Sequence, residues 1–561
     1  MFMIDRFLFL FVAFVLASSG IHAQADKDHH FKVAKNLDVF NIIYKQLDLM
    51  YVDTLNADQT VGNGIRMMLR SLDPYTEYYS EKDLKDLKFM TTGKYAGIGA
   101  LIKYHQLGKE VVIDEPYEGN PAVEAGLKKG DVILAIDNVS CKGKDVSFVS
   151  SHLRGDPGTS FVIQVFRPST NKKMKMKITR RIIQNPAIPF YGMRENHIGY
   201  INLQSFTDGC SKDMRRAIVD LQRQGMKSLI LDLRGNGGGS EQESVDIVNM
   251  FVPKGTMIVE NRGKIKRANM EFRAKVEPID SLMPIVVLVN NGTASAGEIT
   301  SGALQDLDRA VVMGTRTYGK GLVQMTVNLP YNETLKLTTA KYYIPSGRCI
   351  QAVKYNRDGS AVANELVDSL KQTFYTLNGR KVYDGGGIMP DVKVENDSVP
   401  SIIYYLISGR DSTEVIFDYV SEYVKSHPTI AKPGDFELSD ADYEAFKKHV
   451  VGKGFTYGRD SEKYLQELLK LVKFEGYYED TKEDFEHLQQ KLSHNIEKDL
   501  EYNKSMIKQV LESDIITAYY YQRGAVENSL KSDKQVQAAV DLLNDLERYH
   551  SILRPVKKVE K

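Results

Sequence analysis

A serine within a run of small residues is the first candidate for chemistry. Ser295 lies in NNGTASAGE (residues 290–298), which joins an apolar stretch to a helical one. If the apolar stretch is a parallel strand, Ser295 lies at the carboxyl edge of the sheet, where open α/β folds place their sites. The N–H groups of the helix N-terminus would then stabilise a developing oxyanion. The spacing to Glu298 also fits a helix capping box, so this segment alone leaves a structural serine open.

A lysine between two glycines is the second candidate. Lys320 lies in GTRTYGKG (residues 314–321), which follows the next apolar stretch and should reach the same sheet edge. A lysine base must be neutral near pH 7, so its pKa must fall by about 3 from about 10.4, which desolvation can supply. A Ser–Lys pair then needs no histidine. Lys320, Leu322 and Gln324 alternate along the predicted strand, so Gln324 could hydrogen-bond the lysine amine. A solvent-exposed lysine is the simpler reading of Lys320 alone.

A glycine-rich turn is the third candidate. DLRGNGGG (residues 232–239) directly follows an apolar run, and consecutive glycines can present backbone N–H groups to an anion. The structural alternative is a flexible strand-to-helix turn. The spacing matches neither a dinucleotide fingerprint nor a P-loop. Without a CxxC or HExxH motif the sequence predicts no metal and no cofactor, and the three cysteines are expected to be buried free thiols, although their number permits one disulfide bridge.

Alternating strands and helices must position these candidates. The predicted strands are 228–233, 284–289 and 310–314, and the predicted helices cover Met214 to Leu221, Val245 to Phe251 and 295–306. Continuous apolar strands are typical of a parallel sheet that is buried on both faces. Residues 183–395 are therefore expected to form an α/β core.

Three further regions surround this core. Residues 93–182 carry short β-rich runs separated by turns, as in a small, partly open β-barrel. Residues 26–92 are expected to be helical, with a second helix over 58–71 that Leu72-Asp73-Pro74 ends. Residues 396–561 are largely helical and charged, for example over 461–473 and 484–512, and are expected to form a solvated appendage. The predicted fold is thus a multidomain mixture of α/β and α+β, with helical N-terminal and C-terminal regions.

The first residues predict export. Arg6 precedes an apolar run over 7–17, and Ala23-Gln24-Ala25 has the form of a signal-peptidase site, so 1–25 is predicted to be a cleaved signal peptide. Eleven apolar residues are too few to span a bilayer, although an uncleaved anchor is the alternative. We expect a periplasmic or cell-envelope location rather than secretion into the medium. The net charge of +1 does not favour nucleic acid as a partner.

The three candidate segments, in this order, resemble the C-terminal processing, or tail-specific, proteases of peptidase family S41. LDPYTEY (72–78), YIPSGR (343–348) and GGGIMPD (385–391) are similar to the flanking motifs of that family. The resemblance covers residues 35–395 and implies a serine endopeptidase. It implies that Ser295 attacks, Lys320 is the general base and Gln324 orients the lysine. It also implies an oxyanion hole from the N–H of Ala296 and from that of Gly238 or Gly239.

The same resemblance identifies residues 93–182 as a PDZ domain inserted before the protease core. Its carboxylate-binding loop would be Gly97, Ile98, Gly99 and Ala100, which would capture the C-terminus of a protein or peptide substrate. The bound tail would add a strand to the domain edge. Arg154 is implied to link ligand binding to alignment of the active site, and its alternative role is that of a turn-stabilising surface residue.

The sequence therefore predicts an exported endopeptidase that recognises C-terminal tails and cleaves them, for processing or degradation. A catalytically silent PDZ adaptor would instead lack Ser295, Lys320 or the glycine turn, and all three are present. An acyl-CoA enzyme of similar architecture is disfavoured by the same residues. The role of residues 396–561 stays open between forming a homodimer and shaping the cleft.

Overall fold

A computed structural model describes residues 28–84, 92–106, 108–355, 361–363, 372–395, 398–408, 414–492 and 495–554. The predicted signal peptide lies outside these residues. The chain divides into two compact units, one of residues 1–78 with 357–359 and one of 79–356 with 360–561. Among the described residues, none of the helices combines the length and the apolar character that a bilayer crossing requires.

The described part of the first unit, residues 28–78, consists mainly of two helices. The first covers residues 28–50, and the second, α2, covers Ala57–Arg70. The Asn56 side chain caps α2 by accepting a hydrogen bond from the Gln59 N–H. After α2, the Asp73 carboxylate accepts hydrogen bonds from the N–H groups of Tyr75 and Thr76, which stabilises the turn at Pro74. The predicted end of this helix is thus confirmed.

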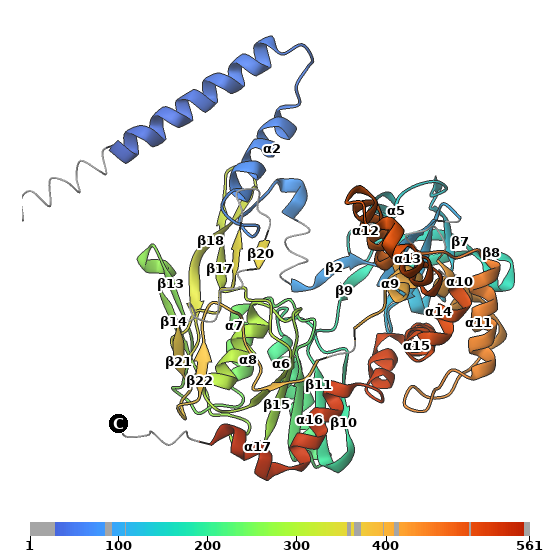
Figure 1. The fold of residues 1–561 in the computed structure, drawn as a ribbon. Helices are drawn as coiled ribbons and strands as arrows, with labels where there is room; N and C mark the ends of the chain where they lie inside the picture. The colour runs from blue at the N-terminus through green and yellow to red at the C-terminus, as the bar shows by residue number, and fades with distance from the viewer. Residues whose placement is uncertain are drawn as a thin grey trace, which may run out of the picture. The chain divides into compact units, whose positions relative to one another are not determined.

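A β-rich module opens the second unit (Figure 1). Its main sheet has the order β3-β4-β5-β7-β8, with β6 beside β5. The first and last strands of the module, β2 and β9, pair with each other in a separate sheet. The strands are β2 (Lys94–Gly97), β3 (Ala100–His105), β4 (Glu110–Pro116), β5 (Val132–Ile136), β6 (Val139–Ser140), β7 (Ser160–Arg167), β8 (Lys172–Thr179) and β9 (Arg181–Gln184), and the helices are α4 (Pro121–Glu124) and α5 (Val146–Leu153). The short strands separated by turns that the sequence predicts for residues 93–182 are thus confirmed.

The α/β core is built on a six-stranded sheet of order β10-β11-β12-β15-β16-β23. All neighbouring pairs are parallel except β10 with β11. Its elements are β10 (Phe190–Met193), β11 (Ile198–Asn202), α6 (Cys210–Arg223), β12 (Ser228–Asp232), α7 (Glu241–Val248), β15 (Ile285–Val289), α8 (Ala296–Asp306), β16 (Val311–Gly314) and β23 (Val392–Lys393).

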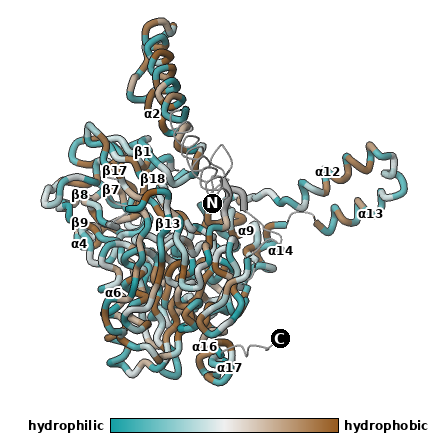
Figure 2. The backbone as a smooth tube through the Cα atoms, turned by 90° about the vertical axis from the view of Figure 1, so that its left-hand side faces the viewer, coloured by the Kyte–Doolittle hydropathy of each residue, from teal (hydrophilic) through white to brown (hydrophobic). Residues whose placement is uncertain are grey.

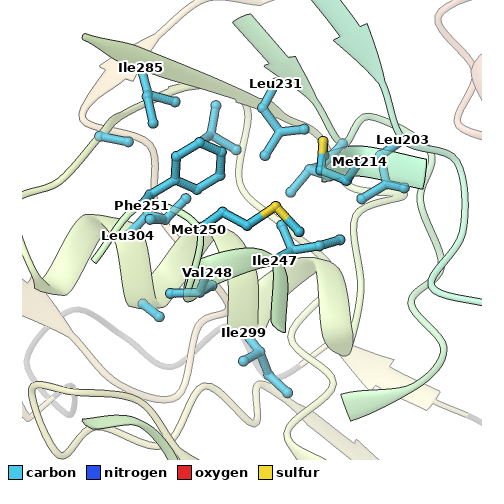
Figure 3. Packing of buried hydrophobic residues seen from close by; sticks show 14 of the residues in the cluster. Leu203, Met214, Leu231, Ile247, Val248, Met250, Phe251, Ile285, Ile299 and Leu304 are labelled. Carbon is cyan, nitrogen blue, oxygen red and sulfur yellow. The ribbon is translucent and has the colours of Figure 1, made fainter. Parts of the chain in front are cut away.

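One face of this sheet packs against α6, α7 and α8. Alternate strand residues such as Leu231 and Ile285 point toward Met214, Phe251 and the helices around them, and all of them are buried (Figure 3). Because side chains of a strand alternate between its two faces, the intervening residues must be covered from the other side.

The other face is covered by the end of the chain. Helices α16 (Lys534–Asn544) and α17 (Leu546–Leu553) lie beside the sheet (Figure 1), and α16 buries Val536, Ala539 and Leu542 against Ile230 and Val286. The Tyr549 hydroxyl donates to the Ile285 carbonyl at 3.0 Å and accepts from the Ile285 N–H at 2.9 Å. The expectation of a solvated appendage is therefore wrong for these helices, because they complete the core.

A second sheet lies beside the α/β core. Within it, β18 pairs with β13 and β17, and β13 pairs with β14. The elements are β13 (Met257–Gly263), β14 (Met270–Arg273), β17 (Leu322–Asn328) and β18 (Thr334–Tyr343), and two hairpins follow, β19 (Val353–Tyr355) with β20 (Ala361–Ala363) and β21 (Thr373–Tyr375) with β22 (Lys381–Tyr383).

The remaining helices form a helical region with a core of its own. They are α9 (Ser401–Ser408), α10 (Val415–Ser426), α11 (Asp440–Gly452), α12 (Asp460–Phe474), α13 (Tyr478–Lys491), α14 (Ile496–Tyr502) and α15 (Lys504–Ser529). Buried aromatic and aliphatic side chains such as Tyr443, Phe446 and Ile515 fill it, so it is not a solvated appendage either. Helices α12 and α13 project from this region as a hairpin (Figure 2). The predicted helical character of residues 484–512 is confirmed, and three helices share this stretch because Asn495 and Asn503 begin new helices there.

This helical region also contacts the β-rich module. Phe417 of α10 packs on Val112 and Val132, and Lys103 lies with its amine 3.6 Å from the Phe417 ring centroid. On α15, Asp514 pairs with Lys129 at 3.0 Å. Apolar contact and ion pairing together therefore attach the module to the helical region.

Candidate functional site

Three loops meet at the carboxyl edge of the parallel sheet. They follow β12, β15 and β16 and carry the glycine turn, Ser295 and Lys320 respectively. The Ala294 N–H donates to the Asn236 carbonyl at 2.9 Å, and the Tyr318 N–H donates to the Thr293 carbonyl at 3.0 Å. Backbone hydrogen bonds thus join each loop to the next, as the order of the strands predicts.

Ser295 lies on a strained turn between β15 and α8. Its backbone has φ 55° and ψ −116°, a left-handed conformation that a residue with a Cβ rarely adopts. It is the N-cap of α8, so the capping role considered for this serine is present. A sharp strand-to-helix turn of this kind holds a nucleophile at the edge of a sheet. The role of helix N-cap and the half-buried position at the sheet edge are therefore compatible.

The Glu298 carboxylate links the serine loop to the lysine loop. It is fully buried, and its Oε2 accepts hydrogen bonds from the N–H of Ser295 and from that of Lys320, each at 2.9 Å. The two backbone nitrogens therefore lie no further apart than twice that distance. Its Oε1 accepts from Thr317 Oγ1 at 2.5 Å and from the Gly319 N–H at 2.7 Å. Burial raises the pKa of Glu298 to about 7, and these four donors oppose that rise.

Tyr342 of β18 links the same two residues from the other side. Its hydroxyl lies 3.2 Å from the Ser295 carbonyl oxygen and is also in hydrogen-bond contact with the Lys320 carbonyl oxygen. The side chain is 2% exposed, and burial with the nearby Glu298 raises the pKa of its hydroxyl. Two buried side chains thus each hold the backbones of Ser295 and Lys320 together.

The two candidate oxyanion glycines differ in their surroundings. A Cβ on Gly238 would lie 2.7 Å from the Ser295 Cβ, so the turn packs directly on the serine. The Gly238 N–H donates to Asn236 Oδ1 at 2.8 Å and is therefore occupied. Within the described part of the chain, the N–H groups of Gly239 and Ala296 have no hydrogen-bond acceptor. Gly239 is exposed, so a substrate can reach it.

Gln324 lies near the lysine loop but has a partner of its own. Its Nε2 donates to Thr338 Oγ1 on β18 at 3.2 Å. The pairing of β17 with β18 shifts in register between Val323 and Gln324, so the simple alternation from Lys320 does not continue along β17. Lys320 itself is half-buried.

The β-rich module keeps the second set of predicted residues together. Ile98 is buried, and Gly99 has φ 71°, where a Cβ would lie 2.4 Å from that of Asn120. Strand β3, which begins at Ala100, is the edge of its sheet, with α5 beside it. The Arg154 guanidinium lies 5.4 Å from the Tyr95 ring centroid, next to Gly97. Burial raises the pKa of Tyr95, and Arg154 partly offsets this rise.

Sequence reasoning did not identify the roles of Glu298 and Tyr342. Glu298 was visible only as half of a capping box, and its spacing gives no sign of Lys320 as a second partner. Tyr342 adjoins the YIPSGR motif, but no local pattern places it against Ser295. Arg348 of that motif pairs with Asp306 at 2.8 Å at the end of α8, where both are buried. In the described ranges, no cluster of His, Cys, Asp and Glu side chains could hold a metal.

Comparison with known proteins gives three matches along the chain. The model of peptidase family S41 matches residues 197–361, a PDZ domain model matches 94–178, and "Probable PDZ-protease, C-terminal helical domain" matches 402–543. The carboxy-terminal-processing protease of Bartonella bacilliformis is 34% identical over 363 residues, 64% of this chain and 82% of that protein. The carboxy-terminal processing protease CtpA of Bacillus subtilis is 31% identical over 368 residues, 65% and 77% of the two chains. A solved photosystem II D1 C-terminal processing protease is 28% identical with a TM-score of 0.35, covering 64% of this chain and 88% of that one.

Proposed function

Since this chain belongs to the carboxy-terminal-processing proteases of peptidase family S41, a family of serine-type peptidases, we propose that Ser295 is its nucleophile and Lys320 its general base. The observation that carries this proposal is the shared clamp. Glu298 accepts from the N–H groups of both Ser295 and Lys320, and the single hydroxyl proton of Tyr342 faces the carbonyl oxygens of both, so the two backbones are fixed against each other. A serine that only capped a helix would not need buried side chains that also bind the backbone of Lys320.

The proposed reaction proceeds through an acyl-enzyme. Neutral Lys320 Nζ takes the proton of Ser295 Oγ as that oxygen attacks the scissile carbonyl, and the proton then passes to the leaving amine. Lys320 Nζ then takes a proton from a water molecule, whose oxygen attacks the ester, and the proton passes to Ser295 Oγ as the new carboxylic acid leaves. Gln324 is proposed to lie close enough to orient the lysine, although it also bonds to Thr338.

The oxyanion hole is proposed to consist of the N–H groups of Ala296 and Gly239. Both lack an acceptor among the described residues, whereas the Gly238 N–H is already bonded to Asn236. Gly238 then has a different role, because only a residue without a Cβ fits against Ser295. Ala296 begins α8 and Gly239 immediately precedes the N-cap of α7, so both N–H donors lie at helix starts, where they can stabilise the tetrahedral intermediate.

Substrate recognition is assigned to the PDZ domain. A C-terminal tail would add a strand beside β3, with its carboxylate at Gly97, Ile98, Gly99 and Ala100. Arg154 lies at this loop beside Tyr95, so it can respond to an incoming carboxylate and transmit binding to the protease core. We place the protein outside the cytoplasm, in the periplasm or cell envelope, on the strength of the signal-like residues 1–25.

Turnover of an unfolded protein substrate tests the proposal. Wild-type protein is expected to cleave it, and Ser295→Ala and Lys320→Met are expected to lose the activity. Cleavage by Ser295→Ala at the wild-type rate would rule out Ser295 as nucleophile. Tail binding by a wild type that never cleaves would support the adaptor alternative instead.

A further inference from the structure

The glycine turn is tied to the C-terminal segment through Arg234. The Arg234 guanidinium donates to Asp232 through Nε at 2.9 Å and Nη2 at 2.5 Å. Its other edge donates to Asp533, through Nη1 at 3.0 Å and Nη2 at 2.7 Å. Nη1 also donates to Gln535 Oε1 at 3.0 Å. Every guanidinium nitrogen is thus engaged, and the fork geometry fixes the plane of the side chain.

Asp533 and Gln535 are themselves held firmly. Asp533 is the N-cap of α16, since its Oδ1 accepts from the N–H groups of Gln535 and Val536, each at 3.0 Å. Gln535 is fully buried and donates through Nε2 to the Val394 carbonyl at 2.6 Å. Because α16 packs on the sheet, these two side chains are an anchor with little freedom.

Arg234 stands at the start of the loop that ends against Ser295. Further along this loop, Gly238 packs directly on the serine, and Gly239 follows with its unengaged N–H. A shift of the Arg234 backbone would therefore displace both glycines relative to the nucleophile. A buried or half-buried ion pair adds little net stability in general, so stability alone is a weak explanation for this network.

We propose that Asp533, assisted by Gln535, is a positioning residue for peptide hydrolysis, which it serves by holding Arg234 and thereby the Gly238–Gly239 turn against Ser295. This proposal rests on the proposed function above. It gives the C-terminal helices a role in catalysis, because the anchor lies some three hundred residues beyond the loop that it holds.

Steady-state cleavage by the full chain carrying Asp533→Asn tests this role. Asparagine caps helices as well as aspartate does, so α16 keeps its cap while Arg234 loses a charged partner. We expect kcat to fall by about tenfold to a hundredfold with KM nearly unchanged, since small displacements at an oxyanion hole have effects of that size. Asp533→Glu, which keeps the charge, is expected to recover part of kcat. The matched control is Asp545→Asn, at the exposed cap of α17.

Hydrogen exchange separates positioning from unfolding. In Asp533→Asn we expect faster exchange of the amides over 235–240 and unchanged exchange within α8. If Asp533→Asn does not fold, Asp533→Ser, which also keeps a cap, is measured in its place.

Wild-type kcat in a folded Asp533→Asn protein would overturn the inference while leaving the proposed function intact, as would equal losses in the Asp545→Asn control. A wild-type protein that cleaves no better than Ser295→Ala would overturn the proposed function itself.

Discussion

Replacement of Glu298 by glutamine tests whether the buried clamp serves catalysis. Above pH 7, where Glu298 is ionised, its carboxylate accepts four hydrogen bonds, two at each oxygen. Glutamine has one acceptor oxygen, so in either orientation its amide group faces two donors. The protein then loses two hydrogen bonds and leaves two buried donors unpaired. At about 1–3 kcal/mol each, this lowers the free energy of unfolding by about 2–6 kcal/mol.

The larger effect is expected on the reaction. The N–H groups of Ser295 and Lys320 share one Glu298 oxygen, so an amide at that position pushes both backbones apart. A displacement of about 1 Å at reacting groups lowers rates by about a hundredfold, so kcat of Glu298→Gln should fall at least that far. Assays are run on an unfolded protein substrate, well below the melting temperature of the variant.

Glu243→Gln is the matched control for this experiment. Glu243, in the first turn of α7, also accepts hydrogen bonds from backbone N–H groups, those of Gly209 and Ser211 at the start of α6, each at 2.8 Å, instead of those of Ser295 and Lys320. Its replacement should lower stability and leave kcat within about twofold of wild type. The reasoning is refuted if Glu298→Gln retains wild-type kcat, or if both variants lose activity only in proportion to stability.

Three further predictions follow from the site. Gly238→Ala should abolish cleavage, because the φ of Gly238 is 98° and the new Cβ would lie 2.7 Å from that of Ser295. The control Gly237→Ala has open space around its Cβ and should stay active. Equal activities of the two variants would contradict the packing argument. Tyr342→Phe removes the hydroxyl that contacts the Ser295 carbonyl and should lower kcat about tenfold, and a kcat unchanged in steady-state assays would exclude a role for that contact. Burial raises the pKa of Glu298 from 4.5 to about 7, so folding disfavours the ionised form of this residue. The contribution of Glu298 to the free energy of unfolding is therefore greatest below pH 4.5. It declines by about 3 kcal/mol as the pH rises through 7. Denaturant unfolding of wild type and Glu298→Gln between pH 4 and 8 measures this change, and a difference that is constant with pH would contradict it.

The sequence was most informative where hydrophobic pattern alone determines structure. The run from Ser228 to Asp232 is wholly buried, and its alternate residues face opposite layers, as expected for a parallel strand covered on both sides. A strand that is buried on both faces needs helices on its second face as well, so the sequence also predicted a second layer of helices. Its position in the chain could not be predicted, because the amphipathic pattern of α16 does not specify which surface it will cover.

The sequence predicted the site residues that lie at strand ends. It did not predict the residues that hold them in position. Ser295 and Lys320 follow adjacent strands, so their approach follows from topology. Tyr342 and Asp533 reach the site across long separations in the chain, and each belongs to an element whose local pattern is ordinary. Contacts of this kind depend on tertiary packing, which a single sequence does not encode in any short motif.

Covalent labelling of the nucleophile tests the central claim most directly. Wild-type protein is treated with a fluorophosphonate, which reacts only with an activated serine, and the modified peptide is identified by mass spectrometry. We expect a single adduct on Ser295, and we expect Lys320→Met, which keeps the length and loses the amine, to react at least about a thousandfold more slowly. Labelling of another serine, or labelling of Ser295 at the wild-type rate in Lys320→Met, would contradict the Ser–Lys mechanism.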